Sequence, residues 1–257
     1  MCINIVAIGK NREEIKDVIE ETFIANKKAN DDGFFVGDIA GGKIIRTLDE
    51  KEALKTIKSL NSTYVHMHMR AATSGKIDVA NVHGWRFEDY LVSHNGYYGR
   101  IYSKVDDNSD SFNMFSAIDY SSVEAIIQSI NKMKDDIYGV LFFTSPSIII
   151  VAGIDKAVRL YKSENNFYLA NTDIDLTESF FGLTFDVYNT SFIDGVLVFA
   201  IDGEDIKLVR KEKISVDKKY GRYKYFGYNR ADEYDDDYLY DGLSDRYILD
   251  KYRVNRL

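Results

Sequence analysis

The chain contains a single cysteine, Cys2, directly after the initiator methionine. A cysteine thiolate can act as a nucleophile in covalent catalysis. Free cysteines are nevertheless common as small, buried, inert side chains, and the stretch that begins at Cys2 has the composition of a strand. Position alone leaves both interpretations open, so other residues must decide between them.

All four histidines, His66, His68, His83 and His94, lie within 29 consecutive positions. Strand alternation puts His66 and His68 on one face, which makes them a candidate metal pair. No carboxylate at a recognisable spacing accompanies them, and there is no H-E-x-x-H motif. We therefore predict no metal ion and keep a histidine-ligated metalloenzyme as one alternative.

Four short motifs follow one another along the first half of the chain: "HMRAATSG" (68–75), "NVHGWRF" (81–87), "VSHNG" (92–96) and "NSDSF" (108–112). Together with Cys2 they resemble the N-terminal-nucleophile domain of class II glutamine amidotransferases. That family has cysteine at its mature N-terminus, followed by H-x-R-[WY]-A-T-x-G, N-x-H-P-[FH], H-N-G and [GS]-D-[TS]-[ED]. Each motif alone is a weak signal, but the ordered set is specific. The resemblance covers at least residues 2–112, and later strands look like the family's second half, out to about residue 200.

The resemblance implies a catalytic role for Cys2, Asn95 and Gly96. Removal of Met1, which is expected before a small residue, would give Cys2 both a thiol and an α-amine. The α-amine has a reference pKa near 7.7–8.0, so it can accept a proton while the thiol attacks a carboxamide to form a thioester. By resemblance, the Asn95 side-chain amide and the Gly96 backbone N–H donate to the oxyanion.

The resemblance also implies the substrate contacts. Arg70 matches the arginine that pairs with the α-carboxylate of glutamine, Asp110 the acid that holds its ammonium group, and Thr73 a threonine that lines the pocket. The implied reaction is hydrolysis of glutamine to glutamate and ammonia without a cofactor. No ammonia-accepting domain is recognisable in the sequence, so we expect any acceptor synthase to act in trans.

The sequence departs from the family pattern at several positions. Ile3 replaces a glycine, Ala71 an aromatic residue and Gly84 a proline, and Ser74 stands where histidine is frequent. These changes predict a wider or differently shaped pocket. A catalytically idle relative of the same fold, for instance a viral protein with a structural or interaction role, therefore stays open as the main alternative.

Composition narrows the remaining classes of protein. The net charge of −8 and pI of about 5.1 do not favour a broad nucleic-acid-binding face. One cysteine excludes an internal disulfide and fits a reducing compartment. No secretory signal or membrane-length apolar stretch is evident. We expect a cytoplasmic protein that binds neither membrane nor nucleic acid; the sequence leaves its oligomeric state open.

Hydrophobic periodicity predicts the elements that must position these residues. Strand-like patterns cover 2–8 and 62–69, helical patterns cover 11–28 and 109–134, and a hairpin turns at Ser145–Pro146. The strand before Asn95–Gly96 is predicted to end there in a turn, since Asn-Gly is a common hairpin signal. Early helices followed by many strands predict an α+β fold, and the resemblance implies a four-layer αββα sandwich of two antiparallel sheets.

The composition changes after about residue 212. Nine of the 19 tyrosines lie between Tyr220 and Tyr252, in a segment rich in charged residues. We predict an amidotransferase-like domain over residues 2–212. The extension over residues 213–257 is expected to pack on that domain or to dock a partner, with packing favoured because tyrosines bury large areas.

Overall fold

A computed structural model describes residues 2–73, 75–99, 109–154, 158–171, 186–188 and 195–214. The helices of these residues are α1 (Arg12–Asn26), α2 (Glu50–Lys58), the short 3-10 helix η1 (Val79–Asn81), α3 (Asp110–Ser116) and α4 (Val123–Met133). Most of the predicted extension, residues 215–257, lies outside the described part of the chain, so the domain division stays a prediction.

The described strands form two sheets in which every pair is antiparallel. The first has the order β11 (Asp186–Tyr188), β9 (Arg159–Lys162), β10 (Asn166–Ala170), β1 (Ile3–Gly9), β4 (Tyr64–Met69), β2 (Phe34–Asp38) and β3 (Lys43–Thr47). The second has the order β13 (Asp205–Lys213), β12 (Gly195–Asp202), β8 (Ile148–Ile154), β7 (Ile137–Thr144), β6 (Tyr90–Tyr98) and β5 (Trp85–Phe87).

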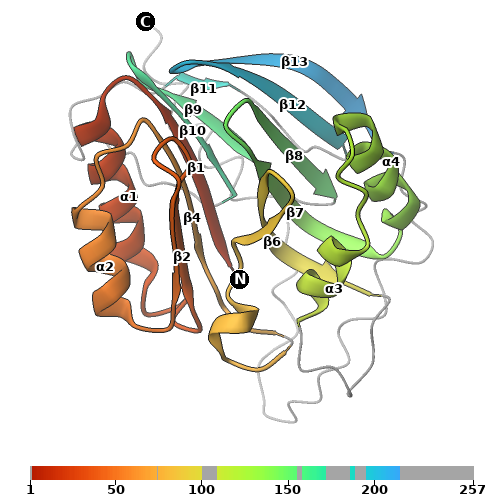
Figure 1. The fold of residues 1–257 in the computed structure, drawn as a ribbon, viewed down its shortest axis with the longest axis horizontal. Helices are drawn as coiled ribbons and strands as arrows, with labels where there is room; N and C mark the ends of the chain where they lie inside the picture. The colour runs from red at the N-terminus through yellow and green to blue at the C-terminus, as the bar shows by residue number, and fades with distance from the viewer. Residues whose placement is uncertain are drawn as a thin grey trace, which may run out of the picture. The chain divides into compact units, whose positions relative to one another are not determined.

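Side-chain alternation divides the core into three apolar layers. On β1, Ile5 and Ala7 face the helices α1 and α2, whereas Val6 and Ile8 face the other sheet. On β7, Leu141 and Phe143 pack towards α3 and α4 in the same way, while its alternate residues face inwards. The resulting order is helices, sheet, sheet, helices (Figure 1), which confirms the predicted four-layer αββα sandwich.

The helices begin where the sequence provides capping side chains. Asn11 accepts from the backbone N–H of Glu14 at the start of α1, Asp49 caps α2 and Ser122 caps α4. Apolar residues at helical spacing then face the sheets; in α4 they are Ile126, Ile127, Ile130 and Met133. The layers therefore bury the faces that the periodicity predicts.

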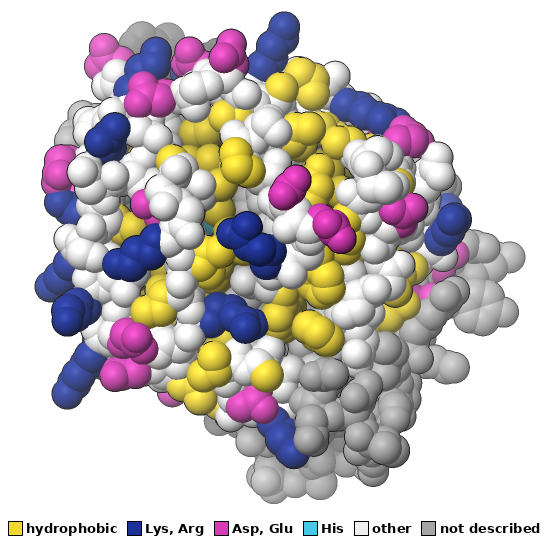
Figure 2. Space-filling view, in the orientation of Figure 1, with side chains coloured by type: hydrophobic (Ala, Val, Ile, Leu, Met, Phe, Trp, Pro, Cys, Tyr) yellow, Lys and Arg dark blue, Asp and Glu magenta, His cyan; other side chains and the backbone are white. Residues whose placement is uncertain are grey.

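Two observations concern the surface of the described residues. No helix there is long and apolar enough to cross a membrane. Acidic and basic side chains intermingle over the face shown in Figure 2 without gathering into a patch of one sign. The N-terminal end of the chain lies between the two sheets, where β1 and β6 approach each other (Figure 1).

Candidate active site

Cys2 directly precedes β1, and its sulfur contacts the backbone just after β4. The Ala71 N–H donates to Sγ over 3.4 Å, and Sγ lies 3.6 Å from the Ala71 carbonyl oxygen. Since Ile3 and Ile5 face the helices, alternation turns Cys2 and Asn4 towards the space between the sheets. Cys2 is partly buried, so its thiol lies at the edge of the inter-sheet layer.

Arg70 follows β4 and is only 2% exposed. Its backbone N–H donates to the Gly33 carbonyl over 2.8 Å, and Nη1 donates to the Lys76 carbonyl over 3.0 Å. Burial lowers the pKa of Arg70, while Cys2 and the carboxylates of three aspartates act in the opposite direction. Those aspartates are Asp32, Asp78 and Asp110. The guanidinium therefore lies among acidic groups beside the thiol.

Asn95 and Gly96 lie within β6, so the turn predicted at this pair is wrong. β6 continues to Tyr98 because β7 pairs with it along its length, with Gly96 opposite Gly139. The two backbones approach so closely that a Cβ on Gly96 would lie 1.9 Å from the Tyr138 carbonyl oxygen. Gly139 has φ +124°, a region that favours glycine. Glycine at these positions serves strand packing rather than a turn.

Asn95 faces the same side of β6 as Ser93, which is hydrogen-bonded to β1. The Ser93 hydroxyl donates to Asn4 Oδ1 over 2.7 Å. Two residues before Ser93 on β6, Leu91 lies beside Gly37 of β2. The inward-facing residues of β6 therefore come closer to the Cys2 end of the inter-sheet layer as the strand runs from Leu91 to Asn95. Asn95, which is 3% exposed, is the next inward-facing residue in that direction.

Asp110 is the first residue of α3, and β6 is hydrogen-bonded both to it and to the residue that follows it. Its Oδ2 accepts from the backbone N–H of Tyr98 over 2.8 Å. The next residue, Ser111, is hydrogen-bonded through its hydroxyl to Nδ1 of His94 over 2.9 Å. His94, the histidine of the H-N-G motif, therefore anchors the helix that carries Asp110.

The loop after Arg70 is tied to both sides of the site. The Ala72 N–H donates to Asp32 Oδ2 over 2.7 Å, while Thr73 is exposed. Asn81 donates through Nδ2 to the Lys76 carbonyl and accepts from the Ser109 N–H through Oδ1 over 2.7 Å. Asn81, the first residue of the second motif, thus links this loop to the start of α3.

The three other histidines belong to the buried interior beside the site. His66 is hydrogen-bonded to Thr144 Oγ1 over 2.9 Å and to Ser93 Oγ over 2.8 Å, and burial lowers its pKa to about 3. His68 and His83 stack with ring centroids 4.1 Å apart, and burial lowers both pKa values well below 6.5. All three are therefore neutral at physiological pH.

The pairing of His66 and His68 on one face, as alternation predicts, creates no metal centre in the described part of the chain. Both ring nitrogens of His66 are hydrogen-bonded to hydroxyl groups. Across the same residues, no group of three or more histidine, cysteine or acidic side chains converges on one point.

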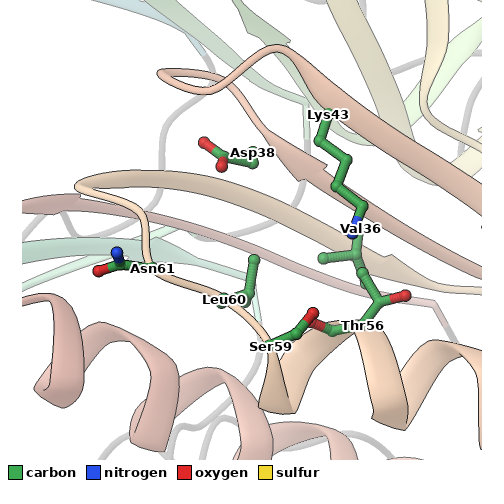
Figure 3. Close-up of a pocket in the computed structure, with 7 residues that line it drawn as sticks. All are labelled: Val36, Asp38, Lys43, Thr56, Ser59, Leu60 and Asn61. Atoms are coloured by element: carbon green, nitrogen blue, oxygen red, sulfur yellow. The ribbon is translucent and has the colours of Figure 1, made fainter.

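A small cavity of about 40 Å³, shown in Figure 3, borders the residues before β4, whereas Arg70 follows the other end of that strand. Its lining comes from β2, β3, α2 and the residues after α2: Val36, Asp38, Lys43, Thr56, Ser59, Leu60 and Asn61. The Asp38 carboxylate already accepts from Ser62 Oγ and from the Gly41 N–H. The volume is near that of a single water molecule, and we assign no function to it.

One contact near Cys2 has no counterpart in the sequence-based prediction. Asn171, directly after β10, donates through Nδ2 to the Cys2 carbonyl over 3.3 Å and accepts from the Asn4 N–H through Oδ1 over 2.6 Å. The sequence contains no local signal for this contact, because the partners are 167 and 169 positions apart.

Comparison with solved structures reveals proteins of the same fold. Glutamine phosphoribosylpyrophosphate (PRPP) amidotransferase from B. subtilis superposes with a TM-score of 0.60 over 83% of this chain, at 14% identity. This chain has the fold of the glutamine amidotransferases. A glutamine aminotransferase class-II domain protein from Silicibacter pomeroyi matches with a TM-score of 0.50, at 12% identity over 83% of this chain and all of its own. The resemblance drawn from the motifs is thus confirmed for the fold.

The chain spans about half of the longer proteins that share this glutamine amidotransferase fold. It covers 49% of the B. subtilis enzyme and 49% of a structure described as the allosteric regulatory enzyme of purine biosynthesis, which matches with a TM-score of 0.59 at 16% identity. No protein-family profile and no curated protein matches the sequence.

Proposed function

We propose that this protein hydrolyses the carboxamide of glutamine with Cys2 as the nucleophile, in the manner of a glutaminase subunit. The observation that carries the proposal is the meeting of motifs that lie far apart in the sequence. The Cys2 sulfur contacts the residue after Arg70, and the Arg70 guanidinium lies within electrostatic range of both Cys2 and Asp110. The three groups at this end of the inter-sheet layer match the three parts of an amino-acid amide such as glutamine. The thiol is suited to attack the carboxamide, the guanidinium to pair with the α-carboxylate, and the carboxylate to pair with the α-ammonium group.

In the proposed reaction, Cys2 Sγ forms a bond to the amide carbon and its proton passes to the α-amine exposed by removal of Met1. The Asn95 side-chain amide and the Gly96 N–H donate to the oxyanion of the tetrahedral intermediate. Collapse of the intermediate breaks the C–N bond, and the amine proton leaves with ammonia. Water then attacks the thioester, which yields glutamate and regenerates the thiol.

Arg70 and Asp110 select the amino-acid end of the substrate in this proposal. A guanidinium has five N–H donors, so the contact of Arg70 with the Lys76 carbonyl is compatible with a second partner such as the substrate carboxylate. Asp110, held by the Tyr98 N–H, presents a carboxylate suited to an ammonium group. Thr73, in the loop between them, would line the entrance.

The ammonia produced has two fates that the proposal allows, release to solvent or transfer to an acceptor synthase acting in trans. The similarity to a longer amidotransferase supports the second fate, since this chain matches only about half of that enzyme. No cofactor is required for the hydrolytic step itself, and cytoplasmic conditions would keep the thiol reduced.

The proposal is tested by measuring ammonia release from glutamine with purified protein whose N-terminus has been sequenced. We expect hydrolysis by the form that begins with Cys2, much slower hydrolysis of asparagine, and no hydrolysis by Cys2→Ala. Glutamine hydrolysis that continues in Cys2→Ala would overturn the proposed nucleophile. Turnover of other amides with none of glutamine would overturn the proposed substrate.

A further inference from the structure

Asn171 extends the ladder between β10 and β1 with its side chain. The register of the two strands pairs Ile5 with Ala170, so Asn171 is the next residue opposite Asn4. Its backbone N–H donates to the Asn4 carbonyl over 3.3 Å. Its Oδ1 accepts from the Asn4 N–H over 2.6 Å, and its Nδ2 donates to the Cys2 carbonyl over 3.3 Å. The side-chain carboxamide of Asn171 thus continues the hydrogen bonding between the two strands beyond the end of β10, as far as Cys2.

Cys2 needs such restraint because it lies outside the regular strand. The pairing of β1 with β4 begins at Ile3 and Met69, one residue after Cys2. On the β4 side, the Ala71 backbone contacts the sulfur itself. On the β10 side, Asn171 holds the Cys2 carbonyl, which fixes the backbone from which the thiol projects. The two contacts act on different atoms of the same residue.

We propose that Asn171 is the positioning residue for the Cys2 thiol. This inference rests on the proposed function, in which Cys2 is the nucleophile. A nucleophile must be held within about 0.5 Å of its productive position, and a displacement of about 1 Å costs on the order of 10² in rate. Once Met1 is removed, Cys2 is joined to the chain by a single peptide bond. The hydrogen bond from Asn171 to its carbonyl group therefore limits how the residue can rotate.

The structure supplies a matched control in Asn166, at the other end of β10. Asn166 accepts through Oδ1 from the Asn11 N–H over 3.0 Å and donates through Nδ2 to the Asn11 carbonyl over 3.0 Å. It therefore ties β10 to the chain after β1, as Asn171 ties it to the chain before β1. Removal of either side-chain carboxamide breaks hydrogen bonds to backbone groups far away in the sequence. Of the two residues, only Asn171 contacts Cys2.

The experiment compares Asn171→Ala, Asn171→Asp and Asn166→Ala with the wild type in glutamine hydrolysis, in thermal unfolding and in alkylation of Cys2 by iodoacetamide across a range of pH. For Asn171→Ala we expect kcat to fall about 10- to 100-fold with KM within about threefold. Asn171→Asp keeps an acceptor for Asn4 but places a carboxylate against the Cys2 carbonyl, so we expect an equal or larger loss of kcat. The added charge should also shift alkylation of Cys2 to higher pH.

Asn166→Ala should keep the wild-type kcat at temperatures where it is folded, whatever its melting temperature. A wild-type kcat in Asn171→Ala, or an equal loss of kcat in Asn166→Ala, would overturn the positioning role. Failure of the proposed function has a different signature, because the wild type itself would then hydrolyse no glutamine.

Discussion

Acidification is expected to destabilise this protein through the histidines buried beside the site. His66, His68 and His83 are buried, and burial lowers the pKa of each far below 6.5, to about 3 for His66. In the unfolded chain they titrate near their ordinary pKa of about 6.5. Between these values the unfolded state binds more protons than the folded state, so the stability present above about pH 6.5 is lost as the pH falls.

The magnitude follows from the size of the pKa difference. Each such histidine changes the free energy of unfolding by up to about 1.4 kcal/mol per pH unit below pH 6.5. From about pH 7 to about pH 5.5 this gives roughly 1.3 kcal/mol for each residue and about 4 kcal/mol for the three together. Carboxylates with an ordinary pKa near 4 stay ionised in both states over this range and contribute little.

The assay is urea-induced unfolding of the full chain at several pH values between about 7 and 5.5, with His66→Gln as the variant. The wild type should lose about 4 kcal/mol of unfolding free energy, and the variant, which lacks one titrating group, about a third less. A total loss below about 1 kcal/mol, or an unchanged loss in the variant, would refute the conclusion that these rings are held neutral in the fold.

Three further predictions concern the site itself. Arg70→Lys, which keeps the charge but loses the planar fork, should raise KM for glutamine about 10-fold and leave a simple aliphatic amide unaffected; an equal effect on both amides would make Arg70 purely structural. Asn95→Ala should lower kcat by on the order of 10² with a smaller change in KM, and a change in KM alone would contradict its contact with the oxyanion. Gly96→Ala should destabilise the fold by at least about 1–3 kcal/mol in thermal or urea unfolding, because its Cβ would meet the backbone of β7. Gly99→Ala, where the nearest atom is 3.5 Å away, should be close to neutral.

The fold could be predicted from the sequence because most of its signals are local. Alternating residues over 62–69 predict β4, and two apolar runs separated at Ser145–Pro146 predict the β7–β8 hairpin. The prediction failed at Asn95–Gly96, where the local signal was a turn. Gly139 explains the difference: it lies 43 positions away and allows two strand backbones to approach closely.

The candidate site could be predicted only in part, for a similar reason. The motifs predict Cys2, Arg70 and Asp110 as site residues and also contain His94, but they give no sign of which residues hold these side chains in place, and Asn171 lies outside every motif. Asn171 contacts Cys2 across 169 positions, and His94 contacts Ser111 of α3 through a hydrogen bond that depends on how the helix packs against β6. Such contacts follow from the tertiary arrangement of the layers, which local patterns do not specify.

The most direct test of the central claim is the intact mass of the protein before and after incubation with 6-diazo-5-oxo-norleucine, an electrophilic analogue of glutamine. If Cys2 is the nucleophile of a glutamine site, the protein should lack Met1 and gain one adduct on Cys2. Glutamine should slow the labelling, and Cys2→Ala should abolish it while remaining folded. A retained Met1 with no adduct, or an adduct that persists in Cys2→Ala, would contradict the account.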